Sequence, residues 1–490
     1  MKYLKILCLS VFSLSAFSVG AQEQLGLRLE NFSGNRAVFL NPASTVSMPM
    51  KWDVNVASAG IFAENNYGLL QDASLSAVWR QRENFMLIAA DDVTSETTLT
   101  PSTFIGDYNR DGRRRYLSAL AVINGPSVLL RLREEHTAGL FYNFRFGFGS
   151  ANVPTTLSYY DYFNRDFFDP FPVAPFDGVA MAWEEVGFHY SYRYETAEGW
   201  FAMGANVKNL RGKEAAFFEN VNPIVLTKTG QDSLTTDLAV FEYGLTTASL
   251  DQSGYAHQTL GRGVGIDAGI SATFGGFKDE GYNIKLGLAV IDIGRINFNR
   301  STQKHRSEVN QTTTVAIDDF ADLSSPDDYP ILLRTFSQLT QGDSTATLID
   351  DNFTIGLPTA VSIQADYSFN AQFYVNLTVV ERISLGNINR LRRGNIIALT
   401  PRFEQRWLAA QVPLVFYDNR KTRVGLSFRL AYLTVGTDNI GSLFGRFSDL
   451  TGTDFYVGLK INPATLATGD RYENPGRLRK KRKRVRCYFF

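Results

Sequence analysis

A two-residue alternation of apolar and polar side chains limits the fold of this sequence more than any other feature. It recurs in segments of about ten residues, the length at which a tilted strand crosses a membrane. Because successive side chains of a strand point to opposite faces, each segment predicts a β-strand with one apolar and one polar face. The segments that show it best are residues 52–57, 139–148, 185–194, 264–272, 361–367, 423–430 and 455–461. In the first of them, Trp52, Val54 and Val56 alternate with Asp53, Asn55 and Ala57.

Several features favour an all-β transmembrane barrel over a soluble β-sandwich or propeller, whose strands also bury one face. Many segments reach about ten residues, whereas strands of soluble proteins usually have about 5–6. Their charged residues fall opposite the aromatic stripe, and 40 glycines suit a chain with many turns. Bacterial barrels usually have an even number of strands. We therefore expect a single antiparallel barrel of about 14 strands, within a range of about 14–16. Residues 85–90 remain ambiguous.

The first 21 residues have the pattern of a cleaved secretory signal. Lys2 and Lys5 precede an apolar run from Ile6 to Val19, and small residues end the pattern at Ala21. The run is shorter than the roughly 20 apolar residues of a spanning helix. Export in a Gram-negative bacterium would deliver the mature chain to the outer membrane. One cysteine, Cys487, remains after residue 21, so an internal disulfide is not expected.

The alternation divides the mature chain into three parts. We expect residues 22–50 to form an N-terminal plug, residues 51–462 the barrel, and residues 463–490 a basic periplasmic tail. Four long stretches, residues 88–114, 149–181, 211–235 and 297–352, interrupt the strands. We assign most of these stretches to the cell surface, because barrels carry their long loops there and short turns on the periplasmic side.

The tail is strongly basic, with eight lysines and arginines between residues 477 and 486. Nucleic acid is not an expected partner of an exported tail. Anionic lipid headgroups or an acidic protein partner fit better, and a disordered tail is the alternative. The chain ends in Tyr488-Phe489-Phe490. This ending resembles the aromatic signal that barrel-assembly machinery recognises, although the last alternating segment lies at residues 454–461.

Several local sequences carry a family resemblance through their order along the chain. They are residues 31–44, 124–127, 135–136, 261–269, 288–294, 357–359, 366–367, 373–376, 400–404 and 435–439. In this order they resemble an uncharacterised group of Bacteroidota outer-membrane barrels, domain-of-unknown-function family 5723. The resemblance implies an outer-membrane barrel and no particular reaction. Asn41-Pro42-Ala43 is also similar to the plug of long-chain fatty-acid transporter barrels, which implies that these residues help to close the lumen.

The predicted inward faces carry many titratable side chains, which are the candidates for lining the lumen. They are Arg145, Glu185, His189, Arg193, Lys208, Asp267, Lys285, Asp366, Arg402, Glu404 and Arg429. A lumen this polar holds water or ion pairs, which argues against a channel for purely apolar ligands. Glu185, His189 and Arg193 recur at even spacing, ~7 Å apart for neighbouring even positions. They could line a permeation path or form an acid–base site, but a self-neutralising charge ladder is the simpler interpretation.

An aromatic stretch in the second long loop suggests an interaction surface. Its residues are Tyr159, Tyr160, Tyr162, Phe163, Phe167, Phe168, Phe171 and Phe176, interrupted by prolines. A large exposed aromatic patch would indicate a site for a protein partner or a ligand. The alternative is a loop that folds over the barrel mouth or lies in the membrane interface.

A partial calcium loop lies in the first long stretch. Asp107, Asn109 and Asp111, followed by Gly112, match the first ligands of an EF-hand loop. The twelfth position is Ser118 instead of the bidentate glutamate, so the motif is incomplete. A polar surface turn explains it equally well. Calcium is the one cofactor that the sequence suggests.

These patterns predict a non-enzymatic outer-membrane channel or transporter for small or amphipathic solutes. No catalytic triad or zinc spacing accompanies the four histidines. The alternative is a non-conducting barrel that anchors an interaction component of a secretion or surface-assembly complex. Its protein partner would bind the surface loops or the basic tail.

Overall fold

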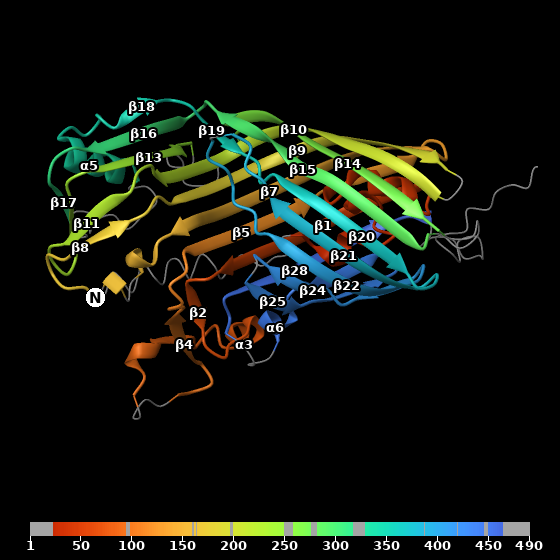
Figure 1. The fold of residues 1–490 in the computed structure, drawn as a ribbon, viewed down its shortest axis with the longest axis horizontal. Helices are drawn as coiled ribbons and strands as arrows, with labels where there is room; N and C mark the ends of the chain where they lie inside the picture. Colours follow the sequence, from red (N-terminus) through yellow and green to blue (C-terminus); the bar gives the residue numbers. More distant parts are fainter. Residues whose placement is uncertain are drawn as a thin grey trace, which may run out of the picture.

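In a computed structural model, the wall-forming strands close into an antiparallel β-barrel of 14 strands, as the alternation predicts (Figure 1). The structure describes residues 23–94, 99–158, 161–162, 164–196, 199–248, 258–275, 282–316, 329–386, 388–418, 420–444 and 449–463. The predicted signal, residues 1–21, and residues 464–490 of the predicted tail lie outside this part of the chain. No helix within the described ranges is long and apolar enough to cross a lipid bilayer.

The wall closes where β1 (Trp52–Asn65) pairs with β28 (Gly452–Ile461). Several wall positions hold two or three strands in succession, because the chain breaks and resumes along the same neighbour. From β1 the order is β5 (Arg115–Asn124) with β6 (Ser127–Arg131), β7 (His136–Val153), β9 (Asp177–Glu195), β10 (Gly199–Asn220), β13 (Ala239–Thr246) with β14 (Gly261–Phe274), β15 (Ile284–Phe298) with β16 (Thr302–Val309), β18 (Leu348–Asp350) with β19 (Phe353–Gly356) and β20 (Ala360–Ser368), β21 (Phe373–Arg382), β22 (Ile396–Glu404), β23 (Leu408–Gln411) with β24 (Leu414–Tyr417), β25 (Lys421–Val424) with β26 (Leu426–Leu430), β27 (Leu433–Thr437) and β28.

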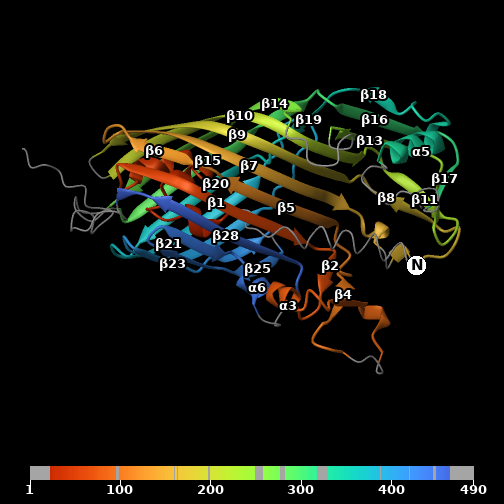
Figure 2. The ribbon, with the colours of Figure 1, turned by 180° about the vertical axis from the view of Figure 1, so that it is seen from behind.

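The two ends of the barrel differ in their connections. Short turns join the strands at one end, on the right in Figure 1, and we call it the turn end. The opposite loop end carries a four-stranded sheet of β8 (Pro170–Val173), β11 (Ile224–Lys228), β12 (Ser233–Thr236) and β17 (Thr313–Ala316). A second small sheet holds β2 (Gly68–Leu70), β3 (Met86–Ala89) and β4 (Thr103–Tyr108). The short helices α3 (Leu75–Arg80) and α6 (Ile440–Leu443) and the longer α5 (Tyr329–Gln341) also lie here, as the reverse view shows (Figure 2).

The long stretches are therefore only partly loops, which corrects the sequence prediction. Strands β7, β9, β10 and β16 extend into three of them and lengthen the wall toward the loop end. The ambiguous segment at residues 85–90 contains β3, which pairs with β4 outside the barrel wall. Extra sheet pairing beyond the barrel satisfies backbone groups that a bare loop would leave to water.

Side chains alternate between the inner and outer faces as predicted, with one exception in β1. Along β9 Glu185, His189 and Arg193 are buried inside while Phe188 and Tyr194 are exposed outside. The prediction that Ala57 faces inward is wrong. A β-bulge between Asn55 and Ala57 shifts the register, so that Val56 and Ala57 both face outward. A bulge adds one residue to a strand and inverts the alternation after it.

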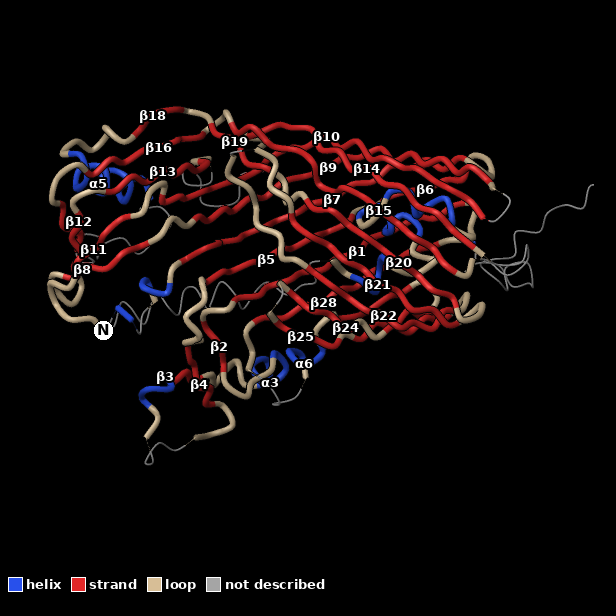
Figure 3. Tube along the Cα trace, in the orientation of Figure 1, coloured by secondary structure: helices blue, strands red, loops and turns tan. Residues whose placement is uncertain are grey.

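Residues 23–50, which we call the plug, lie inside the turn half of the barrel (Figure 3). The plug contains α2 (Leu25–Arg28) and the 3-10 helices η1 (Gly34–Phe39) and η2 (Pro42–Ser47). Helix η2 contacts β9, β10, β14 and β15, whereas η1 contacts β1 and β6 and α2 contacts β26 and β27. Nearly every described side chain of the plug is buried. The segment thus touches much of the wall's circumference.

The aromatic ring of Phe141, which faces the plug, packs directly on a glycine of the neighbouring strand. Phe141 of β7 points inward and meets Phe39 of the plug edge-on, with ring centroids 5.2 Å apart. On the neighbouring strand, a Cβ atom at Gly187 would lie 2.0 Å from the Phe141 ring. Glycine at position 187 is therefore a steric requirement of this contact.

We predict that Gly187→Ala destabilises the barrel by about 1–3 kcal/mol through overpacking. Urea unfolding of the refolded protein measures the change. Gly178→Ala on the same strand is the control, because its added methyl group would meet atoms only at 3.9 Å. Combining Gly187→Ala with Phe141→Leu should recover part of the loss. A fully additive double variant would contradict the proposed steric cause.

Candidate functional site

An ionic cluster centred on Asp292 of β15 ties the plug to the wall. Asp292 has a left-handed backbone, with φ 56°, at a register shift between β14 and β15. Its carboxylate accepts Arg145 of β7 at 2.8 Å, Lys208 of β10 at 2.7 Å and Arg393 at 3.1 Å. A buried carboxylate with three cationic partners is held in place from three directions.

Three further carboxylates and one further cation bring the charge of this Asp292 cluster to zero. Lys208 also bonds Asp267 at 2.8 Å, and Arg145 bonds Glu185 at 3.0 Å. Glu23 of the plug bonds Arg393 at 2.5 Å and Arg28 at 3.1 Å. The cluster thus contains four cations, Arg28, Arg145, Lys208 and Arg393, and four carboxylates, Glu23, Glu185, Asp267 and Asp292. Its formal charge is zero, as expected of charges removed from water.

A second cluster lies nearer the turn end around Glu30 of the plug. Arg429 of β26 donates to Glu30 at 2.5 Å, and Gln411 donates to the same carboxylate at 3.1 Å. Arg402 of β22 bonds Asp366 at 2.7 Å and also bonds Glu404. The Glu404 carboxylate in turn accepts the backbone N–H of Asn31 in the plug. The plug therefore contributes both a carboxylate and a backbone donor to the wall.

A third set of contacts joins residues 32–36 of the plug to β1 and β28. Asp53 accepts the backbone N–H of Asn35 at 3.0 Å, and the Arg36 side chain donates to Asn55 at 2.9 Å. Lys460 donates to the backbone carbonyl of Phe32. Burial lowers the pKa of Arg36 to about 10, against the opposing effect of Asp53 and Glu30. Arg36 is still cationic at neutral pH, so its charge is part of the interface.

Asn41-Pro42-Ala43 lies in a slot formed by Gly204 of β10, Gly269 of β14 and Gly287 of β15. A Cβ atom at Gly204 would lie 2.6 Å from the Pro42 backbone, and one at Gly269 would lie 2.3 Å from the Asn41 side chain. Asn41 caps η2 by accepting the Ala43 N–H at 2.9 Å and donates to the carbonyl of Ile270 at 3.1 Å. Asn41 thus caps its own helix and fastens it to β14.

A second segment enters the lumen from the loop end. Residues 388–395, in the connection between β21 and β22, fold inward, and Leu391 is 2% exposed. A Cβ at Gly147 of β7 would lie 2.2 Å from the Leu391 side chain. Arg393 of this inner loop carries the 2.5 Å contact to Glu23. The plug and the inner loop thus meet within the Asp292 cluster.

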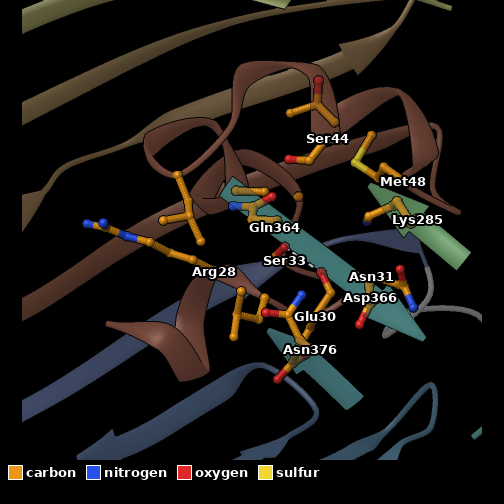
Figure 4. A pocket seen from close by; sticks show the side chains of 15 residues that line it. Arg28, Glu30, Asn31, Ser33, Ser44, Met48, Lys285, Gln364, Asp366 and Asn376 are labelled. Carbon is orange, nitrogen blue, oxygen red and sulfur yellow. Dashed lines mark hydrogen bonds between the residues drawn. The ribbon is translucent and has the colours of Figure 1, made fainter. Parts of the chain in front are cut away.

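A small polar cavity separates the plug from β20 and β21. Asp366, Asn376 and Lys285 reach it from the wall, and Glu30 and Ser33 reach it from the plug (Figure 4). Its volume of about 20 Å³ is enough for about one water molecule. This gap between plug and wall is therefore too small for a solute.

All the titratable residues predicted to line the lumen lie on the inner face, and ten of them are buried while Lys285 is half-buried. Glu185 and His189 have separate partners. The His189 ring hydrogen-bonds Thr45 of the plug at 2.8 Å and Asn206 at 2.7 Å. Glu185 accepts Arg145 and the indole N–H of Trp183. Both side chains are 0% exposed, so the arrangement favours a structural charge ladder over an acid–base site.

The described residues of the predicted aromatic surface fall into two groups, one packed in the small sheet at the loop end and one exposed to solvent. Phe171 is 1% exposed and packs with Val173 in the core of the small sheet at the loop end, while Tyr162 and Phe176 pack against that core. Phe167 and Phe168 are 51% and 72% exposed. Tyr159, Tyr160 and Phe163 lie outside the described residues. Among the described residues of the expected patch, Phe167 and Phe168 are the exposed aromatic side chains.

The predicted calcium ligands have protein partners. Asp111 accepts Arg115 at 2.6 Å, Asp107 accepts Gln71 at 2.8 Å, and the Asn109 side chain accepts the Asp111 N–H at 3.2 Å. Desolvation raises the pKa of Asp111, but hydrogen bonds from Arg113 and Arg115 outweigh it and leave the pKa below its usual value. Over the described ranges no group of three or more His, Cys, Asp or Glu side chains could hold a metal ion. Calcium binding remains a prediction.

Sequence reasoning did not single out four charged residues that organise the site, namely Glu23, Glu30, Asp292 and Arg393. The plug residues belong to no periodic pattern, and Arg393 lies in a connection. Asp292 follows an apolar run as Ile291-Asp292-Ile293-Gly294. A charge between two isoleucines, followed by glycine, could have indicated a bulge at this point.

Comparison with known families bears on the identity of this barrel. Residues 42–438 match the model described as "Family of unknown function (DUF5723)". The chain belongs to this family. The match confirms the family resemblance predicted from the ordered local sequences. No curated protein matches the sequence of this DUF5723 member.

The solved structures to which this chain is similar include two toluene transporters and a FadL homologue. The P. putida toluene transporter TodX shares 9% identity, with 88% of this chain and 94% of that chain covered and a TM-score of 0.39. The Ralstonia pickettii toluene transporter TbuX shares 9% identity over 88% and 94%, with a TM-score of 0.37. A Pseudomonas aeruginosa FadL homologue shares 11% identity over 91% and 99%, with a TM-score of 0.25. At this level of similarity, the function of the DUF5723 barrel is argued from its own residues.

We predict that Glu23 and Arg393 are energetically coupled. Glu23→Gln or Arg393→Gln alone should cost about 3–5 kcal/mol, because each leaves buried charges without a partner. The double variant should cost clearly less than the sum of the two. The free energy of unfolding in urea measures all three. Arg82→Gln is the control, because its exposed pair with Glu83 at 3.5 Å contributes only about 0–1 kcal/mol. Additive costs would contradict the coupling.

Proposed function

We propose that this protein is an outer-membrane channel that is closed by its plug and conducts small polar or amphipathic solutes when the plug moves. The outer face of the wall supports a membrane position. On β14 the outward side chains from Val264 to Phe274 are all apolar. Ten residue steps at about 3.4 Å and a tilt of about 40° correspond to roughly 26 Å along the membrane normal. This height matches the hydrocarbon thickness that barrels span, about 25 Å.

The polar contact between plug and wall is the observation that carries the proposal. A barrel that needed only a filled core could be packed with apolar side chains, which often stabilise as well as buried ion pairs. Here the contacts are charged on both sides, as in Glu30 with Arg429 and Glu23 with Arg393. Water can solvate both surfaces after separation, so an open lumen would not expose a large apolar area.

The charged side chains on the inner face of the wall also limit which solutes could pass. With the plug displaced, wall charges such as Asp366, Arg402 and Arg429 would face the path. Charges of both signs at close range favour small polar or amphipathic molecules and disfavour extended hydrocarbon chains. This argument rests on the lumen side chains of this chain alone.

A non-conducting barrel that holds a partner is the second candidate. The exposed tip of Phe167 and Phe168 favours it, and Phe168 is held with a left-handed φ of 67°. Exposed aromatic side chains on a strained tip are suited to contact a protein. In this case the plug would never need to move.

Single-channel conductance in a planar bilayer tests the channel proposal. The plug can be cross-linked to the wall at Thr45 and Ser191 of β9, whose side-chain oxygens are 2.7 Å apart. With Cys487 replaced by serine, Thr45→Cys combined with Ser191→Cys should form a disulfide that abolishes channel openings. A reductant should restore the openings, since it frees the plug. The two single cysteine variants are the matched controls.

A variant without residues 23–50 completes the test. We expect it to conduct continuously, because the plug is then absent and the inner loop loses Glu23, the plug residue that Arg393 bonds. Openings that persist in the oxidised, locked protein would show that the plug does not gate them. Absence of conductance in both the intact and the truncated protein, with normal heat-modifiable migration, would contradict the channel and favour the partner-holding barrel.

The membrane position has its own test. Ile270 lies on the outer face of β14 near the middle of the apolar band. We predict that Ile270→Arg destabilises the barrel in lipid vesicles by about 2–4 kcal/mol. Leu348→Arg is the control, because Leu348 is exposed on β18 at the loop end, outside the band. Equal costs for the two substitutions in urea unfolding would argue against the proposed membrane position.

A further inference from the structure

Three arginines on the outer wall face away from the lumen on adjacent strands. They are Arg211 of β10, Arg262 of β14 and Arg295 of β15, and all three are exposed. Arg211 and Arg262 are direct cross-strand partners. Arg295 pairs with Val264, so it lies one outward position from Arg262. Direct partners have Cβ atoms about 5 Å apart, and diagonal neighbours about 7–8 Å apart.

These arginines have no anionic partner within the described part of the chain. No carboxylate there lies within 4.0 Å of their guanidinium groups. Glu184 is opposite Arg211 across the β9–β10 pair, but its carboxylate bonds Lys213 at 3.3 Å. Like charges placed directly opposite one another in a sheet are destabilising. An anion that binds between them would remove this repulsion.

The position of the arginines relative to the membrane indicates the source of that anion. Toward the turn end, the same outer face presents Val207, Val264 and Ile266, which are 53%, 58% and 44% exposed, with the polar Asn209 between Arg211 and Val207. Toward the loop end, the outer face becomes ionic, with Arg306 bonded to Glu242 at 2.6 Å. The three arginines thus lie at the boundary where the apolar band ends. Lipid headgroups occupy this depth.

We infer that Arg211, Arg262 and Arg295 form a binding site for the phosphate groups of a membrane lipid at the loop-end leaflet. Guanidinium groups bind phosphate through paired, charge-assisted hydrogen bonds. The acyl chains of the same lipid would lie against the valine and isoleucine side chains below. The inference rests on the membrane position proposed above, but it requires neither conduction nor movement of the plug.

Lipid binding to the refolded protein in a neutral detergent tests the site, with native mass spectrometry as the readout. The probes are diphosphoryl lipid A, phosphatidylcholine and inorganic phosphate. The variant combines Arg211→Gln, Arg262→Gln and Arg295→Gln. It should lose affinity for lipid A on the order of 100-fold, from about a fivefold loss for each arginine. Arg80→Gln, Arg82→Gln and Arg334→Gln together form the control, because these arginines are also exposed but lie on α3, the turn after it and α5.

The melting temperature provides a second readout, because the effect of Arg262→Gln on it should change sign when lipid A is added. In neutral detergent alone, Arg262→Gln should raise the melting temperature, because it removes the repulsion from Arg211. With lipid A added, the same variant should melt below the wild type, which gains stability from the bound lipid.

Three results would overturn the inference. The first is unchanged lipid A affinity in the triple variant, and the second is equal loss in the control variant. The third is displacement of lipid A by millimolar inorganic phosphate, which would indicate a site for free phosphate. Each of these results is independent of conductance, so a failed lipid site and a failed channel can be told apart.

Discussion

The structure depends on the pairing of charges that have been removed from water. Asp292 is the clearest case, because it joins cations from β7, from β10 and from the inner loop. An unpaired charge at this depth would cost several kcal/mol. The plug and the inner loop supply the missing partners, so the wall, the plug and the loop complete one another. The plug and the inner loop meet at Glu23 and Arg393, which are 2.5 Å apart.

Close approach between plug and wall depends on glycine. At Gly204 and Gly269 even a methyl group would overlap the Asn41-Pro42 backbone or side chain. Glycine weakens a strand, since it has no side chain to pack. In this barrel the plug fills the space that side chains would otherwise fill. The inner face of the wall therefore lacks side chains at these glycines, where the plug packs against it. The polar clusters surround these positions.

The two faces of the wall have separate chemistry. The inner face is ionic and matches the plug, whereas the outer face is an apolar band with a rim of arginines toward the loop end. Beyond that rim, strands such as β10 and β16 continue into a domain with its own core, which includes Phe171 and Ile224. In the proposed channel, this division would allow the lumen contacts to change without altering the outer face.

Much of the fold followed from the sequence alone. The alternation predicted the barrel, a range of about 14–16 strands and the inward position of side chains such as Glu185 and Lys208, because the strand period of two is a local property of the chain. It failed at Ala57, where a bulge inverts the alternation, and within the long stretches, where β9 and β10 extend farther than the pattern predicted. Bulges and strand ends depend on the neighbouring strands.

Tertiary structure decided which charges meet. Glu23 and Arg393 are far apart in the sequence, and neither belongs to a periodic segment, yet they are 2.5 Å apart in the lumen. The same holds for Phe171, whose place in a small core depended on β11 pairing with β8. The sequence by itself determined which side chains face inward, since that choice is local. Only the closed barrel decided their partners, because closure brings distant strands and the plug into one small volume.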